Sequence, residues 1–128
     1  MTVLSLVLGD ASTKQHGGSW SPQRRECVAQ TPEVKVKNKV VAQLKELGAY
    51  YFYPVTGGYG SSGVPDIVGC YEGLFFGIEC KAGKNKPTKL QELNLRQIDR
   101  AGGIALVVNE DNVADVAATL KERANERT

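Results

Sequence analysis

The chain has 128 residues, of which 41% are hydrophobic, and its formal net charge is +2 at pH 7. This length supports one domain with a substantial core but not two, and so small a charge means that a polyanionic partner must be met by a local patch. Three cysteines without metal-ligand or redox spacing indicate free thiols in a reducing compartment. The apolar run Val3–Leu8 has no basic flank and is too short to span a bilayer, so we expect a cytoplasmic protein without a membrane anchor.

The first 30 residues form an N-terminal arm whose role the sequence does not define, and residues 31 to 128 form the domain. Thr31 and Pro32 are typical of a helix start, and Gly48 of a helix end. At helical spacing one apolar stripe forms, made of Val36, Val40, Leu44 and Leu47. Glu33 points along the middle of this stripe. Its carboxylate either complements the helix dipole or needs a buried partner such as a metal ion.

Aromatic residues from Tyr50 to Val55 predict a first strand, which a Gly- and Ser-rich loop follows. The spacing of Gly58, Gly60 and Gly63 matches a dinucleotide-binding pattern, but that pattern requires a helix immediately afterwards. Pro65 and a β-branched run follow instead, so we interpret the match as accidental. Backbone N–H groups of such a loop can approach a phosphate, which makes Ser61 and Ser62 candidates for DNA contact.

Two strand-like runs, 67–71 and 74–78, flank Glu72 and Gly73 and predict a hairpin. A two-residue turn pairs Tyr71 with Leu74, and by the same count Asp66 falls opposite Glu79. Facing carboxylates repel each other, and a cation between them would remove that cost. Lys81 lies two residues beyond Glu79 and projects to the same face, whereas Leu74, Phe76, Ile78 and Cys80 line the other.

A basic loop carrying Lys84 and Lys86 precedes Thr88, which begins a second helix with a capping-box spacing to Gln91. We expect this helix to bury Leu90, Leu93, Ile98 and Ala101. Residues 104–108 form a continuous apolar run, which favours a central strand. Asp111 is expected to cap a last helix that carries Val113, Val116, Ala117 and Leu120, before a charged tail from Lys121 frays.

The expected element order is α-β-β-β-α-β-α, which predicts an α/β fold with a mixed sheet flanked by helices. Within it Glu33, Asp66 and Glu79 offer only hard oxygen ligands, which favour Mg²⁺, or Mn²⁺ as a substitute, over zinc. Such an ion activates water and neutralises phosphoryl charge. Lys81 beside it would stabilise the transition state, with proton transfer as a second possible role. The chemistry indicated is metal-assisted phosphodiester hydrolysis.

A structural interpretation competes with this one, because a Glu-x-Lys on a strand occurs by chance in many proteins and pairs with its neighbours. Gln91 has a structural interpretation too, since as a capping-box residue it would only reach back to the Thr88 N–H. The combination of features favours the catalytic interpretation, because Pro65 and Asp66 open one strand, Glu79 is predicted opposite Asp66, and Glu33 is aimed inward.

The ordered set of motifs resembles the virus-type replication-repair nuclease (VRR-NUC) branch of the PD-(D/E)XK nuclease superfamily. These motifs are Gly63-Val-Pro-Asp66, Phe76-Gly-Ile-Glu79-Cys-Lys81, Lys89-Leu-Gln91 and Gly102-Gly-Ile-Ala-Leu-Val-Val108. The resemblance covers residues 31 to 110 and implies a restriction-endonuclease-like core. It implies metal binding by Glu33, Asp66, Glu79 and the Cys80 carbonyl, and catalytic roles for Lys81 and Gln91. Cys80 stands where the family commonly has an aliphatic residue, which matters little because only its carbonyl is used.

Stand-alone members of this branch are phage proteins that form homodimers and cut branched DNA. The resemblance therefore implies an Mg²⁺-dependent, structure-selective DNA endonuclease acting on four-way (Holliday) junctions in repair or recombination, as a homodimer in the host cytoplasm. We expect DNA contacts from Lys84, Lys86, Lys89, Ser61 and Ser62. The alternative is a DNA-binding module that keeps the fold but has no turnover.

Overall fold

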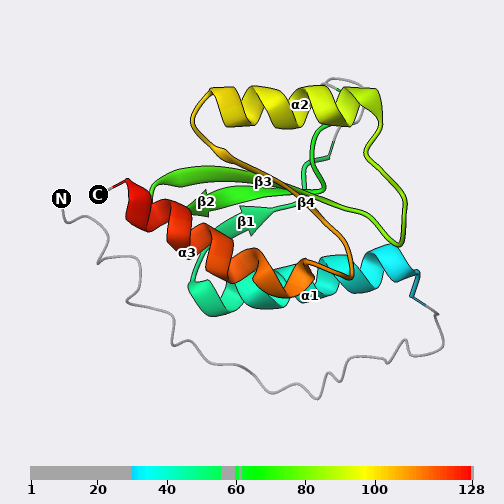
Figure 1. The fold of residues 1–128 in the computed structure, drawn as a ribbon, viewed down its shortest axis with the longest axis horizontal. Helices are drawn as coiled ribbons and strands as arrows, with labels where there is room; N and C mark the ends of the chain where they lie inside the picture. Colours follow the sequence, from blue (N-terminus) through cyan, green and yellow to red (C-terminus); the bar gives the residue numbers. More distant parts are fainter. Residues whose placement is uncertain (1–29, 56–59, 61, 128) are drawn as a thin grey trace, which may run out of the picture.

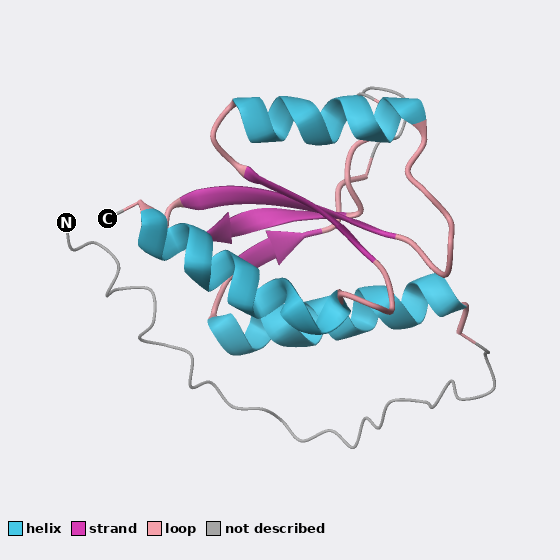
Figure 2. Ribbon diagram, viewed as in Figure 1, coloured by secondary structure: helices cyan, strands magenta, loops and turns pink. Residues whose placement is uncertain are grey.

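The structure is a computed structural model that describes residues 30–55, 60 and 62–127. A four-stranded sheet lies between helix α2 on one face and helices α1 and α3 on the other (Figure 1, Figure 2). The elements in order are α1 (Pro32–Leu47), β1 (Tyr50–Phe52), β2 (Ile67–Tyr71), β3 (Leu74–Cys80), α2 (Lys89–Arg100), β4 (Ile104–Val108), the short 3₁₀ helix η2 (Val113–Asp115) and α3 (Val116–Glu126). Apart from η2, this is the expected order.

The sheet is mixed, as predicted, with the strand order β1-β2-β3-β4. The first three strands are antiparallel neighbours, and β4 runs parallel to β3. The hairpin has the predicted register, because Tyr71 pairs with Leu74 and Ile67 pairs with Ile78. Glu72 and Gly73 form its turn with positive φ angles of 51° and 82°, the backbone that a two-residue hairpin turn requires. The next position beyond Ile67 and Ile78 brings Asp66 to Glu79.

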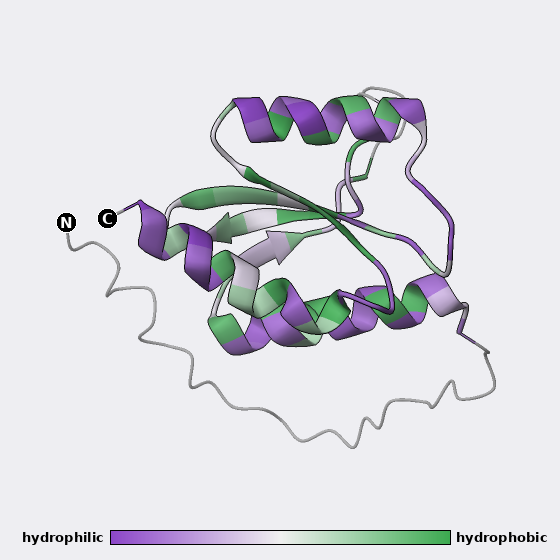
Figure 3. Ribbon diagram, in the orientation of Figure 1, coloured by the Kyte–Doolittle hydropathy of each residue, from purple (hydrophilic) through white to green (hydrophobic). Residues whose placement is uncertain are grey.

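Helix α1 begins and ends where its sequence predicts. The Thr31 side chain accepts a hydrogen bond from the Val34 N–H, and Gly48 ends the helix in the left-handed conformation. Val36, Val40 and Leu44 are buried in the main core, together with the residues of β3 that alternate toward this helix. Helix α3 adds Val116 and Leu120 to the same core. Figure 3 shows hydrophobic residues concentrated in the strands and on one side of each helix.

Helix α2 covers the other face of the sheet, and two glycines allow it to approach closely. A Cβ atom at Gly77 would lie 2.6 Å from Ile98 Cδ1, and one at Gly103 would lie 2.9 Å from Ile98 Cγ2. Ile98 therefore packs directly on the backbone of β3 and of the segment entering β4. This contact fixes the height of α2 above the strand that carries Glu79.

Sequence expectations about hydrophobic burial are wrong for one strand and one helix. In the part of the chain that the structure describes, the strand at 104–108 lies at the edge of the sheet and pairs with β3 alone, and Val107 is exposed. On α2, Leu90 and Leu93 are exposed and Ala101 is exposed at its C-cap, whereas Leu95 is the buried leucine. Among the described elements helix α2 lies alone on its face of the sheet, so less of its surface has a partner than an amphipathic stripe suggests.

The boundaries of the first strand and of the last helix also differ from expectation. The first strand stops at Phe52 rather than Val55. Asp111 caps no helix, because η2 precedes α3 and the side chains of Asn109 and Asn112 hold the intervening turn. The C-terminal segment stays helical to Glu126 instead of fraying from Lys121. Among the described residues no helix is both long and apolar enough to cross a membrane.

Candidate active site

Glu79 is the centre of the site, because it is a carboxylate buried in the sheet, 1% exposed. Its Oε2 accepts a hydrogen bond of 2.6 Å from Gln91 Nε2 and lies 3.6 Å from Lys81 Nζ. Among the described residues its Oε1 is buried without a hydrogen-bond partner. A buried acceptor without a partner costs free energy.

Asp66 directly precedes β2 and approaches the same carboxylate. Its Oδ2 accepts a 2.9 Å hydrogen bond from the Cys80 N–H, which holds the side chain against β3 one residue from Glu79. Burial raises the pKa of the Glu79 carboxyl to about 7, and the negative charge of Asp66 acts in the same direction. Lys81 opposes both effects. The site therefore contains two acidic groups that repel each other and one cation that only partly compensates.

Gln91 combines both interpretations of its sequence position. Its Oε1 accepts a 2.8 Å hydrogen bond from the Thr88 N–H, and its backbone N–H donates to the Thr88 hydroxyl, which completes the capping box. The same side chain donates through Nε2 to Glu79. The cap thus fixes the amide in the orientation that presents its donor to the carboxylate.

Among the described residues, no hydrogen bond or ion pair joins Glu33 to this group. Nor do three acidic, histidine or cysteine side chains of the described part lie close enough together to hold a metal ion. The gathering of Glu33, Asp66 and Glu79 around one ion stays a prediction. By the alternation of β3, Cys80 faces the core that contains α1, and Glu79 faces α2, where it bonds to Gln91.

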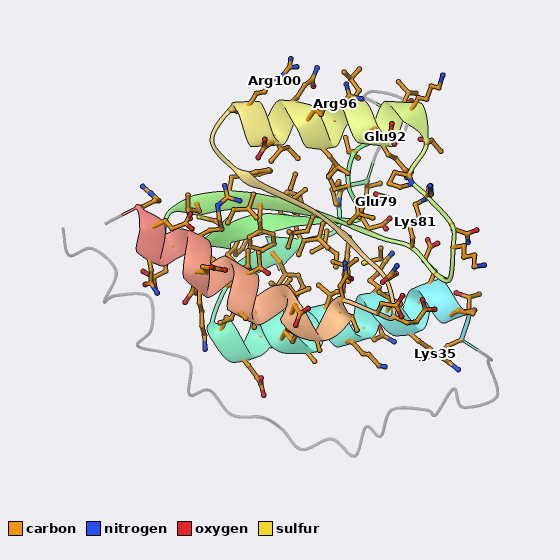
Figure 4. All side chains as sticks on the ribbon, in the orientation of Figure 1. Lys35, Glu79, Lys81, Glu92, Arg96 and Arg100 are labelled. Atoms are coloured by element: carbon orange, nitrogen blue, oxygen red, sulfur yellow. The ribbon has the colours of Figure 1, made fainter. Side chains whose placement is uncertain are left out.

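The charge of Glu33 acts on the thiol of Cys80, the last residue of β3. Burial raises the pKa of the Cys80 thiol to about 12; among weaker influences on it, Lys37 lowers the pKa and Glu33 raises it. Cys80 and Cys70 are both free, and Cys27 lies outside the described residues. Glu33 itself is half-buried in the first turn of α1. Figure 4 shows Glu79 and Lys81 near the end of the sheet where α1 begins.

The residues expected to contact DNA lie around this end. Lys84 and Lys86 are exposed in the loop between β3 and α2, and Lys89 is exposed at the start of α2. Ser62 is exposed, and its carbonyl oxygen accepts a hydrogen bond from Asn94. Ser61 lies outside the described residues.

Two residues that support the site had not been singled out from the sequence. Glu110 Oε1 accepts a 2.8 Å hydrogen bond from the Gly83 N–H and ties the basic loop to the loop after β4. No sequence signal joins residues 27 positions apart in this way. Asn94 links α2 to the loop before β2 through Ser62. The sequence did contain a signal for Asn94, because it lies three residues after Gln91 and therefore on the same side of α2.

No known protein family matches this chain, and no curated protein is significantly similar to it. The fold and the site therefore have to be interpreted from their own geometry.

Proposed function

We propose that the protein is a metal-dependent nuclease that hydrolyses phosphodiester bonds in DNA, with a PD-(D/E)XK-type core of the VRR-NUC kind. The observation that carries the proposal is the Glu79 carboxylate, which is buried beside Asp66, Lys81 and Gln91 and has one oxygen without a partner in the described part of the chain. A buried structural glutamate normally has both oxygens bonded. Here the second oxygen points to a ligand that the protein does not itself supply.

A divalent cation fits this donor set. Mg²⁺ commonly takes one or two protein carboxylates and completes its shell with water and substrate phosphate, so the pair of Asp66 and Glu79 is sufficient without Glu33. The Cys80 backbone lies at the same place, because its N–H is bonded to Asp66. When bound, Mg²⁺ or Mn²⁺ would supply Lewis acidity at a phosphoryl oxygen and a more acidic water. Glu79 and Asp66 would be its ligands, with the Cys80 carbonyl as a further one.

The side chains around the carboxylates have separate tasks. Lys81 holds its ammonium 3.6 Å from Glu79 Oε2, where it stabilises negative charge that develops on a phosphoryl oxygen or on the attacking water. Gln91 keeps the Glu79 carboxylate in one orientation through its amide donor. Lys84, Lys86 and Lys89 are placed to neutralise flanking phosphates, which gives affinity but no sequence preference.

Branched DNA is the proposed substrate and a homodimer the proposed assembly, because two symmetric cuts across a four-way junction require two sites. The test is cleavage of labelled duplex, flap and four-way-junction DNA with Mg²⁺, Mn²⁺ or EDTA. We expect Asp66→Ala and Lys81→Ala to lower the cleavage rate by at least about a hundredfold, as loss of one electrostatic group in such sites does.

Matched controls come from exposed positions away from the site. Asp99→Ala on α2 and Lys121→Ala on α3 remove the same charges and should leave cleavage unchanged. Cutting that persists in Asp66→Ala and Lys81→Ala would show that the site is elsewhere. Binding to branched DNA without any nicking, at every metal concentration, would instead favour the module without turnover.

A further inference from the structure

An apolar cavity of about 320 Å³ opens on the face of the sheet that carries Asp66 and Glu79. We call it the sheet–helix groove, because it lies between the strands and the flank of α2. Its apolar walls include Phe52, Pro54, Val64, Pro65, Phe75 and Ile98. A volume at the lower end of the roughly 300–1,000 Å³ range of small-ligand sites suits a flat group of one or two rings.

The groove exists because α2 covers only half of its face of the sheet. Strand pairing sets Phe52 beside Val68 and Val68 beside Gly77, and α2 rests on Gly77 through Ile98. Among the described residues α2 is the one helix on this face of the sheet (Figure 2), and its main contacts with the sheet are with β3 and β4. Two aromatic rings are consequently left half in solvent: Phe52 is 48% exposed and Phe75 is 47% exposed.

The groove adjoins the candidate active site at two points. Pro65, in its wall, directly precedes Asp66, whose side chain is held against Cys80. Asn94, the polar residue of its lining, lies three residues along α2 from Gln91, a rise of about 4.5 Å. A nucleic acid with its phosphate at Glu79 would therefore have the neighbouring nucleotide within reach of the groove.

We propose that the sheet–helix groove accepts an unpaired nucleobase of the substrate, next to the phosphate that is cut. This proposal rests on the proposed nuclease function and specifies its substrate: DNA in which at least one base beside the cut is out of the duplex stack. A nucleobase is neutral and flat and stacks well on aromatic rings, which suits walls that carry no charged side chain. A base paired within a duplex is shielded on both faces and does not enter such a groove.

The test follows the base directly. A DNA duplex carries the fluorescent base 2-aminopurine either unpaired at a branch or paired in the same sequence, and binding is measured with Ca²⁺ in place of Mg²⁺. With the wild-type protein we expect quenching of the unpaired base only. Phe52→Leu and Phe75→Leu keep apolar volume but lose the ring, so they should abolish the quenching. They should also weaken binding of the branched DNA about tenfold, with paired duplex unaffected.

Tyr53→Leu is the matched control, because Tyr53 lies outside the groove, is 49% exposed, and has its ring beside Tyr51 and Lys37. It should behave as wild type. Equal losses in Tyr53→Leu, or equal losses on paired duplex, would overturn the proposal. Thermal unfolding shows whether each variant is folded. If Phe52→Leu does not fold, the quenching and binding of Phe75→Leu test the proposal.

Other occupants and the failure of the proposed function give different results. If Phe52→Leu and Phe75→Leu halve the molecular mass in solution, a second copy of the chain fills the groove and the proposal is wrong. If Mg²⁺-dependent cutting is lost in Asp66→Ala but 2-aminopurine never responds, the base site is wrong while the nuclease function stands. If the wild-type protein neither binds nor cuts any DNA, both fail together.

Discussion

Among the described residues Glu79 is the one charged side chain that is buried, and its surroundings set its properties. The alternation of the strand predicted its face and its partner Asp66 correctly. It did not predict burial, since α2 had no predicted position over the sheet. The pKa of about 7 therefore follows from packing, chiefly from the loss of water around the carboxyl group.

This raised pKa predicts a pH-dependent stability in the metal-free protein. The pKa of Glu79 is about 7 in the folded state against 4.5 ordinarily, so the folded state binds the proton more tightly. The resulting stabilisation is fully present below pH 4.5 and is lost as the pH rises through 7, a change of about 3 kcal/mol in total. Denaturant unfolding in EDTA at a series of pH values should show the free energy of unfolding falling between pH 5 and 8.

Glu79→Gln is the control for that measurement, because its amide does not titrate. The difference between wild type and Glu79→Gln isolates this one group from every other carboxyl in the chain. Parallel stability curves for the two proteins would show that the carboxyl of Glu79 is not desolvated as described. Addition of Mg²⁺ at pH 8 should restore stability to the wild type and not to Glu79→Gln, since a ligand of the folded state stabilises it.

At the scale of elements, the parts with local signals were predicted well. The turn at Glu72 and Gly73 fixed the hairpin register, and the Thr31 and Thr88 caps fixed two helix starts. Elements whose signal was only hydrophobicity were placed less well. The apolar run at 104–108 was predicted to be central but forms an edge strand of the sheet as far as the chain is described, because hydrophobicity does not specify which strands lie beside it.

The capping box of α2 supports both the helix and the site. Thr88→Ala removes the hydroxyl that accepts the Gln91 N–H, so we expect the free energy of unfolding to fall by about 1 kcal/mol. Thr88→Ser keeps the hydroxyl and should retain most of the stability. Urea unfolding of wild type and the two variants measures the difference. Equal losses of stability in Thr88→Ala and Thr88→Ser would mean that the γ-methyl group, and not the capping hydroxyl, stabilises the helix.

At the scale of the whole molecule, Gln43 connects the first helix to the C-terminal part of the chain. Its Nε2 donates a 2.5 Å hydrogen bond to the Val113 carbonyl, and its Oε1 accepts one of 2.9 Å from the Ala117 N–H. Both partners lie at the junction of η2 and α3, about 70 residues away in sequence. One amide thus satisfies two backbone groups where α1 and α3 meet.

Gln43→Glu should therefore be destabilising at pH 7 by about 2 kcal/mol. A carboxylate still accepts from Ala117, but it cannot donate to Val113 and sets a negative charge against that carbonyl. Asn38→Asp, an equivalent change at an exposed position of α1, should stay within about 0.5 kcal/mol of wild type. Chemical denaturation measures both; a similar small effect for the two would show that the Gln43 bonds contribute little.

The sequence by itself determined the α/β class, the element order, the hairpin register and the pairing of Asp66 with Glu79 and Lys81. These depend on turns, caps and strand alternation, which act over a few residues. Only the tertiary structure decided that Glu79 is buried beneath α2 and that an open groove remains beside it. Those features depend on which helix covers which half of the sheet, and contacts between distant elements leave no mark in a local pattern.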